Sequence, residues 1–85
     1  MPLQGKAALI TGGGRGIGRA IAIAYAKAGA DVCVAARSQD EIEAVATEIT
    51  ELGRKGIAET CDVSDRIAVE SMVESAASQV GHLDI

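Results

Sequence analysis

The chain has 85 residues and a formal net charge of −4, with 24% charged and 48% hydrophobic residues. This composition predicts a globular protein and argues against nucleic acid as a partner, because phosphate backbones are bound by clustered Lys and Arg. No apolar stretch reaches the roughly 18 residues that a membrane span needs, and the first residues lack the pattern of a secretory signal. We therefore expect no membrane association and a cytoplasmic location.

The two cysteines, Cys33 and Cys61, lie far apart in the sequence, and His82 is the single histidine. These residues cannot supply a zinc ligand set, so we expect no metal site and two buried, reduced thiols. The chain has one Tyr and no Phe or Trp. Its core must therefore consist of small aliphatic side chains, which suit buried parallel strands covered by helices.

Three short apolar runs predict strands over residues 6–11, 31–36 and 57–61. Each run is followed by a segment of helical periodicity that ends at a glycine, and residues 83–85 predict the approach to a fourth strand. The apolar stripes expected to face the core are Ile17, Ala20, Ile21, Ala24, Tyr25 and Ala28 in the first helix, Ile42, Val45, Ala46, Ile49 and Leu52 in the second, and Val69, Met72, Val73, Ala76 and Val80 in the third.

Two serines predict helix starts. Ser38 and Glu41 match a capping box, in which each side chain accepts a hydrogen bond from the other residue's backbone N–H. Ser64 predicts the cap of the third helix. The alternation of strand and helix predicts an α/β protein with right-handed crossovers and a Rossmann-type, doubly wound parallel sheet. Residues 1–85 supply the first βαβαβα half of a single such domain.

A glycine-rich loop joins the first strand to the first helix, with the sequence Thr-Gly-Gly-Gly-Arg-Gly-Ile-Gly over residues 11–18. Phosphates bind at such places because unpaired N–H groups and the helix dipole point at the ligand. The spacing matches neither GxGxxG nor a P-loop, and it fits T-G-x-x-x-G-x-G.

This loop resembles the cofactor loop of the short-chain dehydrogenases/reductases. The resemblance implies a binding site for the pyrophosphate of a nicotinamide dinucleotide, formed by a set of residues within the loop: Gly12, Gly14, Arg15, Gly16, Ile17 and Gly18.

Residues at the end of the second strand predict NADP rather than NAD. An NAD site would have an acidic residue there to accept hydrogen bonds from the ribose hydroxyls, whereas this chain has Ala36, Arg37 and Ser38. Arg37 offers a charge-assisted fork to a 2′-phosphate, and Ser38 adds a donor. Arg15 could approach the same phosphate, and by resemblance Arg15 and Arg37 form the basic pair of NADP-dependent family members.

The end of the third strand contains Asp62 and Val63. By resemblance, Asp62 accepts a hydrogen bond from the adenine amino group and Val63 packs on the ring. If Ser64 caps the next helix, Asp62 is left free for the ligand.

The family's catalytic residues, a Ser and a Tyr-x-x-x-Lys pair, have no counterpart in this sequence. Tyr25 has a glycine four residues on and is expected in the core, and His82 is expected in a surface turn. The resemblance extends from about Leu3 to Ile85, about a third of a typical family domain. We therefore expect a fragment or truncated product that is inactive alone and poorly stable or self-associating.

The resemblance implies an NADP-dependent oxidoreductase that transfers hydride between nicotinamide and a carbonyl/alcohol substrate, and a homo-oligomer in the full-length protein. The subgroup with the greatest likeness is the 3-oxoacyl-acyl-carrier-protein reductases. One alternative is a non-catalytic nucleotide-binding fragment. Another is a Rossmann-type methyltransferase, which Ala36 and Arg37 disfavour because that class has an acidic residue at this strand end.

Overall fold

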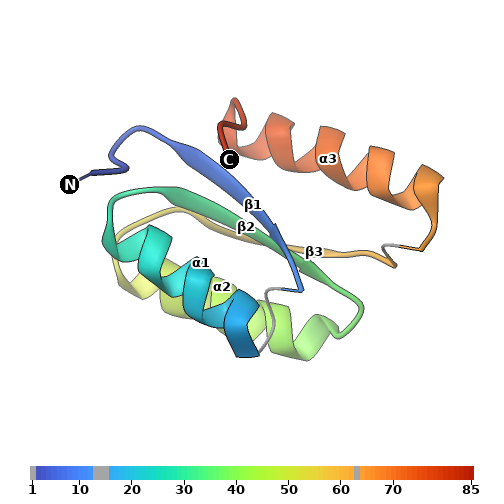
Figure 1. The fold of residues 1–85 in the computed structure, drawn as a ribbon, viewed down its shortest axis with the longest axis horizontal. Helices are drawn as coiled ribbons and strands as arrows, with labels where there is room; N and C mark the ends of the chain where they lie inside the picture. Colours follow the sequence, from blue (N-terminus) through green and yellow to red (C-terminus); the bar gives the residue numbers. More distant parts are fainter. Residues whose placement is uncertain (1, 13–15, 63) are drawn as a thin grey trace.

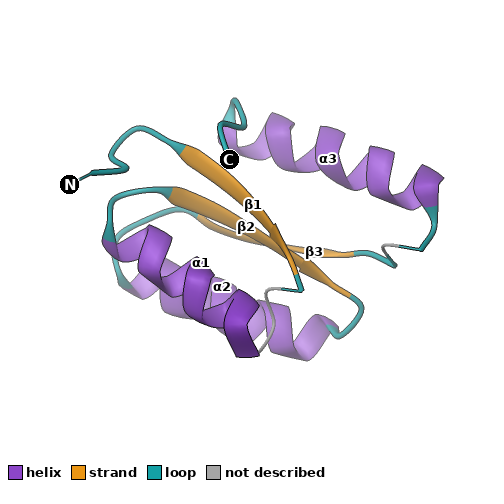
Figure 2. Ribbon diagram, viewed as in Figure 1, coloured by secondary structure: helices purple, strands orange, loops and turns teal. Residues whose placement is uncertain are grey.

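The computed structural model describes residues 2–12, 16–62 and 64–85. Within this part three parallel strands alternate with three helices (Figures 1 and 2). The sheet order is β1-β2-β3, which confirms the predicted first half of a Rossmann-type sheet. The elements in chain order are β1 (Ala7–Thr11), α1 (Gly16–Lys27), β2 (Asp31–Ala36), α2 (Gln39–Glu51), β3 (Gly56–Thr60) and α3 (Arg66–Val80).

The sheet is covered on both faces, with α1 and α2 on one side and α3 on the other (Figures 1 and 2). The central strand β2 is the most deeply buried, because helices cover both its faces and strands flank both its edges. Side chains alternate along a strand. Val32 and Val34 therefore pack towards α1 and α2, whereas Ala35 belongs to the cluster beneath α3.

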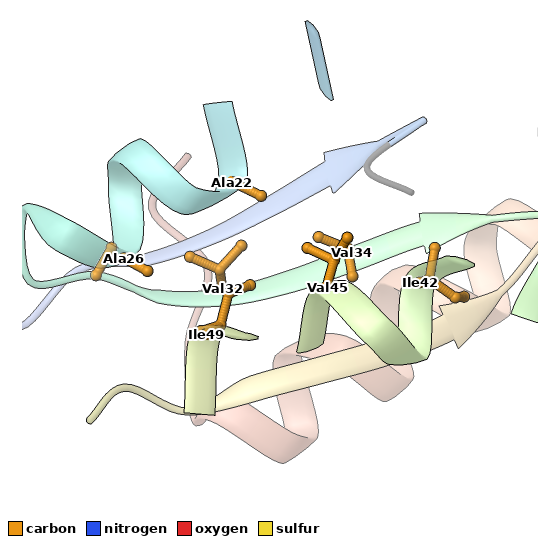
Figure 3. Close-up of a cluster of buried hydrophobic side chains, with 8 residues drawn as sticks. Ala22, Ala26, Val32, Val34, Ile42, Val45 and Ile49 are labelled. Atoms are coloured by element: carbon orange, nitrogen blue, oxygen red, sulfur yellow. The ribbon is translucent and has the colours of Figure 1, made fainter. Parts of the chain in front are cut away.

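The larger core lies between the sheet and the two helices α1 and α2 (Figure 3). The predicted stripe of α2 is confirmed except at Leu52, which follows the helix as its C-cap and is 42% exposed. The buried cluster contains only aliphatic side chains, as the composition predicts: Ala22, Ala26, Ala30, Val32, Val34, Ile42, Val45 and Ile49.

The stripe predicted for α1 is wrong except at Tyr25, which packs against the larger core. Ile17 is 80% exposed and Ile21 is 39% exposed, whereas the residues buried against the sheet are Ala22 and Ala26. The helix is apolar around most of its circumference, so periodicity could not select a face. Two alanines separated by one turn let α1 approach β2 closely, and this close approach decides which face is buried.

The core beneath α3 is smaller. It consists of Ala35, Cys61 and Met72, and α3 also buries Ala76 and Val80 as predicted, while Val73 is 38% exposed. Both cysteines are buried and free, as predicted. Burial, together with the smaller effect of the Glu59 carboxylate charge, raises the pKa of the Cys33 thiol to about 12.

The end of the chain runs beside β1. The N–H groups of Asp84 and Ile85 donate to the carbonyl of Ala7 at 2.8 and 3.2 Å, and the N–H of Leu9 donates to the carbonyl of Ile85 at 2.9 Å. This is the bonding pattern of a parallel bridge. The predicted approach to a fourth strand is therefore confirmed, on the side of β1 away from β2.

Candidate functional site

The strands β1, β2 and β3 end at the same side of the sheet, here called the carboxyl edge (Figure 1). The register pairs Thr11 with Ala35 and Ala36 with Thr60, so the three strand ends are level. The predicted ligand residues follow these ends directly in the sequence. In open parallel sheets, ligands bind outside the carboxyl ends of the strands.

Two glycines shape the loop between β1 and α1. Gly12 and Gly16 have φ values of +68° and +61°, a backbone region in which side chains are disfavoured. Among the described residues, leaving out the chain neighbours, no atom lies within 4 Å of a Cβ atom built at either position, so the backbone conformation and not crowding requires glycine here. The N–H of Gly12 donates to the carbonyl of Ala35 at 2.7 Å. Because this N–H is already paired, the role of Gly12 is to form the turn.

The helix α1 begins at the carboxyl edge (Figure 1). Its first turn contains no acidic residue that would offset the positive end of the helix dipole. Ile17 and Gly18 lie in this turn, with Ile17 exposed. Gly14 and Arg15, which the sequence assigns to the same site, lie outside the described residues, as does Val63.

Arg37 and Ser38 lie exposed between β2 and α2. Ser38 is the N-cap of α2, as predicted, but its side chain makes no capping hydrogen bond, so the Ser38 half of the predicted capping box is wrong. The backbone of Ser38 is extended, as is usual for an N-cap. The acidic Asp40 and Glu41 in the first turn interact favourably with the positive end of the helix dipole.

Asp62 follows β3 and holds the turn that leads to α3. Its Oδ1 atom accepts hydrogen bonds from the backbone N–H of Ser64 at 3.0 Å and from the Ser64 hydroxyl at 2.7 Å. The Ser64 side chain and backbone lower the pKa of Asp62, and the positive charge of Arg37 lowers it further. Asp62 is therefore an exposed, ionised carboxylate near Arg37, and not the unengaged side chain that the sequence predicted.

The predicted cap at Ser64 is also wrong. Asp65 is the N-cap of α3, and its side chain accepts hydrogen bonds from the N–H groups of Ile67 and Ala68. Ser64 is instead the donor to Asp62. Both residues are good caps by type, and the sequence therefore could not decide between them.

The sequence predicts no acid–base group at the carboxyl edge. The two side chains considered for that role, Tyr25 and His82, lie elsewhere in the structure. Tyr25 is half-buried against the larger core, as predicted. His82 is exposed, as predicted, and its Nε2 atom lies 3.1 Å from the Gly5 carbonyl and 2.9 Å from Asp84 Oδ2.

Within residues 2–12, 16–62 and 64–85, no three potential ligands gather as a metal site. No described helix has the length and apolar character to cross a membrane.

Comparison with known sequences decides the family. The sequence profile of the short chain dehydrogenase family matches residues 6–85, almost the whole chain. The chain belongs to the short-chain dehydrogenase family.

Individual relatives agree with the profile. An uncharacterized oxidoreductase of Mycobacterium tuberculosis is 43% identical over 83 residues, covering 98% of this chain and 32% of the relative. The structure of a short chain dehydrogenase from Burkholderia cenocepacia in complex with NADP matches with a TM-score of 0.95 and 46% identity, over 99% of this chain and 35% of that one.

A second solved structure shows a different cofactor. A 7α-hydroxysteroid dehydrogenase, complexed with NADH and 7-oxo glycochenodeoxycholic acid, matches with a TM-score of 0.93 and 40% identity, over 96% of this chain and 32% of that one. This chain thus spans about a third of the length of its relatives. Relatives of similar identity hold either nicotinamide dinucleotide, so the family alone does not fix the cofactor.

Proposed function

We propose that this chain binds NADP(H) at the carboxyl edge and forms the cofactor-binding part of an oxidoreductase. The observation that carries the proposal is the arrangement at that edge. The positive end of α1, the left-handed glycines at 12 and 16, and the exposed Arg37 follow neighbouring strand ends in a short-chain dehydrogenase.

The pyrophosphate fits the start of α1. Helix N-termini bind phosphate because unpaired N–H groups and the helix dipole act together. The space beside Gly12 and Gly16 that the described residues leave unfilled gives a ligand room to approach the backbone. The sequence assigns Gly14, Arg15 and Gly18 to the same cradle, and the solved complex of the Burkholderia relative with NADP supports a nicotinamide dinucleotide as the ligand.

A preference for NADP over NAD rests on Arg37. No carboxylate ends β2, where an NAD site would have one, and Arg37 and Ser38 are both exposed there. A guanidinium binds a 2′-phosphate through charge-assisted hydrogen bonds. Asp62, whose charge interacts with that of Arg37, borders the same region and is the residue we assign to the adenine amino group. Val63 would pack on the adenine ring.

The reaction class follows from the cofactor. A bound nicotinamide dinucleotide supplies or accepts hydride, and the partner of that exchange is a carbonyl/alcohol pair. The residues of this chain would bind and orient the dinucleotide. Reduction of a 3-oxoacyl thioester is our candidate reaction, on the likeness of the glycine loop to that subgroup. A cytoplasmic location and a homo-oligomeric full-length protein complete the proposal.

A second candidate is a nucleotide-binding segment without catalysis. It is favoured by one observation: among the described residues, Tyr25 belongs to the core and His82 lies at the end of α3, away from the carboxyl edge. Both candidates share the same cofactor site, and turnover of a carbonyl substrate by the complete gene product distinguishes them.

Replacing Arg37 with Asp tests the cofactor preference. The binding of NADPH and NADH to the complete gene product is measured by nicotinamide fluorescence. Loss of a charge-assisted hydrogen bond, worth about 1.5–3 kcal/mol, should lower the ratio of NADPH to NADH affinity by roughly 10- to 100-fold.

The matched control is Lys27→Asp, which makes the same charge change in the last turn of α1, at the other end of the helix. We expect this variant to keep the wild-type ratio. An unchanged ratio in Arg37→Asp would overturn the assignment of Arg37, and an equal change in Lys27→Asp would reduce it to an effect of net charge.

A further inference from the structure

The outer edge of β3 carries backbone groups that no described strand pairs. The N–H of Val32 donates to the carbonyl of Lys55, and the N–H of Cys61 donates to the carbonyl of Ala36, both at 2.9 Å. Backbone groups alternate in direction along a parallel ladder. The N–H and C=O groups of Gly56, Ala58 and Thr60 therefore point away from β2, towards the outside of the sheet.

A groove lies beside this edge, between α2 and β3, with a volume of about 490 Å³. Gly56 and Ala58 pair with Val32 and Val34, whose side chains face α2, so these two small residues form the floor of the groove. Both residues provide outward-facing backbone groups. At Gly56 the backbone already lies against α2, because a Cβ atom there would be 2.3 Å from the Ala46 carbonyl oxygen. The lining from α2 consists of Glu43, Ala46, Thr47, Thr50 and Glu51.

The charge of the groove selects a basic occupant. The helix α2 has five acidic residues and no basic residue in the sequence QDEIEAVATEITE. Glu43 and Glu51 lie towards the two ends of the lining, and Glu43 accepts a hydrogen bond from neutral Gln39. A second copy of this chain, paired edge to edge, would place acidic groove against acidic groove.

The edge of β3 is only partly protected against strand addition. Natural edge strands are protected by Pro, by charged side chains, by bulges or by being very short, and β3 has neither Pro nor a bulge, although it is five residues long and includes Glu59. The strand β3 has the sequence GIAET, and its five residues pair with β2 in unbroken register. A regular edge of this kind can accept another strand through main-chain hydrogen bonds.

We propose that the outer edge of β3 binds an extended, basic segment of a partner protein as an added strand. Two Lys or Arg side chains four residues apart would reach Glu43 and Glu51. Those two glutamates are eight residues apart on a helix, about 12 Å along its axis. Residues i and i+4 of a strand are about 13 Å apart and point to the same face. This surface reaches the carboxyl edge only at Thr60 and does not depend on the cofactor proposal.

A fluorescein-labelled peptide, Thr-Lys-Thr-Val-Thr-Lys-Thr, tests the proposal by fluorescence polarisation with the complete gene product at low salt. The double variant Glu43→Gln/Glu51→Gln should weaken binding by about twofold to thirtyfold, the range for two exposed ion pairs. The matched control Glu70→Gln/Glu74→Gln removes the same charge from α3, on the other face of the sheet, and should bind as wild type.

Two further measurements separate strand addition from general attraction of charge. The peptide is N-methylated at alternate residues, in two versions offset by one residue. The version that methylates the N–H groups facing β3 should not bind, because those donors are removed. Peptide-induced amide shifts should concentrate at Gly56, Ala58 and Thr60. Three results would each overturn the proposal. The first is equal weakening of binding in the α3 control, and the second is binding of both methylated peptides. The third is a shift of those amides that depends on protein concentration when no peptide is present.

Discussion

The helices on the two faces of the sheet are held by different kinds of contact. Between the sheet and the helices α1 and α2, eight aliphatic residues are buried in one cluster. Beneath α3, the buried cluster has three residues, and polar contacts supplement it. The Ser75 hydroxyl and the Gln79 amide both donate to Glu59 Oε1, at 2.8 and 2.5 Å, and the Lys55 ammonium donates to the Gln79 carbonyl at 3.2 Å.

This difference indicates which part of the fold is more stable. Apolar burial contributes roughly 25 cal/mol per Å², whereas an exposed hydrogen bond exchanges for one to water at small net gain. The helix α3 also exposes Ile67 at 76% and Val73 at 38%. We therefore expect α3 to open before α2, and local opening of this kind is measurable by hydrogen exchange.

Truncating one buried side chain on each face tests this difference most strongly. Ile49→Ala on α2 should cost about 2–5 kcal/mol in the free energy of unfolding, because Ile49 is fully buried and its neighbours are helix and sheet. Met72→Ala on α3 should cost about 2 kcal/mol or less, because the smaller cluster can collapse around the deleted atoms. Urea unfolding followed by circular dichroism gives both values.

Hydrogen exchange provides the control for this pair. Met72→Ala should accelerate exchange of the α3 amides and leave those of α2 at the wild-type rate. If the two substitutions cost the same and open the same amides, both faces belong to one cooperative unit and the comparison fails.

A smaller effect is expected where α2 meets β3. A methyl group at position 56 would lie 2.3 Å from the backbone carbonyl oxygen of Ala46, too close for any side-chain adjustment to relieve. Gly56→Ala should therefore shift α2 and cost about 1–3 kcal/mol, the usual range for overpacking. Thermal unfolding measures the loss, with Ser78→Ala on the exposed side of α3 as the control. A stability equal to wild type would show that α2 is not held against β3 as closely as the structure indicates.

The order and kind of the elements could be predicted from the sequence because each strand is a short apolar run and each helix ends at a glycine. The buried face of α2 was predictable because its polar and apolar residues segregate. The face of α1 was not, since Ile17 and Ile21 are as apolar as the alanines that pack against the sheet. The role of Gly56 was not predictable either, because it depends on a carbonyl group ten residues away.

At the candidate site, the sequence located the strand ends correctly but not the local hydrogen bonds. The positions of Arg37, Ser38 and Asp62 follow from the strands that precede them. The hydrogen bonds of Asp62, Ser64 and Asp65 depend on which of two neighbouring residues, Ser64 or Asp65, faces the first turn of α3. Residue type alone favours both equally.

That turn gives the smallest of the expected effects and the last test of how α3 is held. Asp65→Ala removes the side chain that accepts from Ile67 and Ala68 and should cost about 0.5–2 kcal/mol, the usual loss for an N-cap. Ser64→Ala should cost less, because Asp62 keeps its bond to the Ser64 backbone N–H.

The pKa of Asp62 should rise in Ser64→Ala, since the Ser64 hydroxyl is the largest cause of its lowering. A carboxyl pKa that is lowered by folding stabilises the folded state only above its unfolded value, and this contribution is lost as pH falls through the folded pKa. Urea unfolding at neutral and acidic pH should therefore show a loss in Ser64→Ala that fades in acid. A larger loss in Ser64→Ala than in Asp65→Ala would instead make Ser64 the cap of α3.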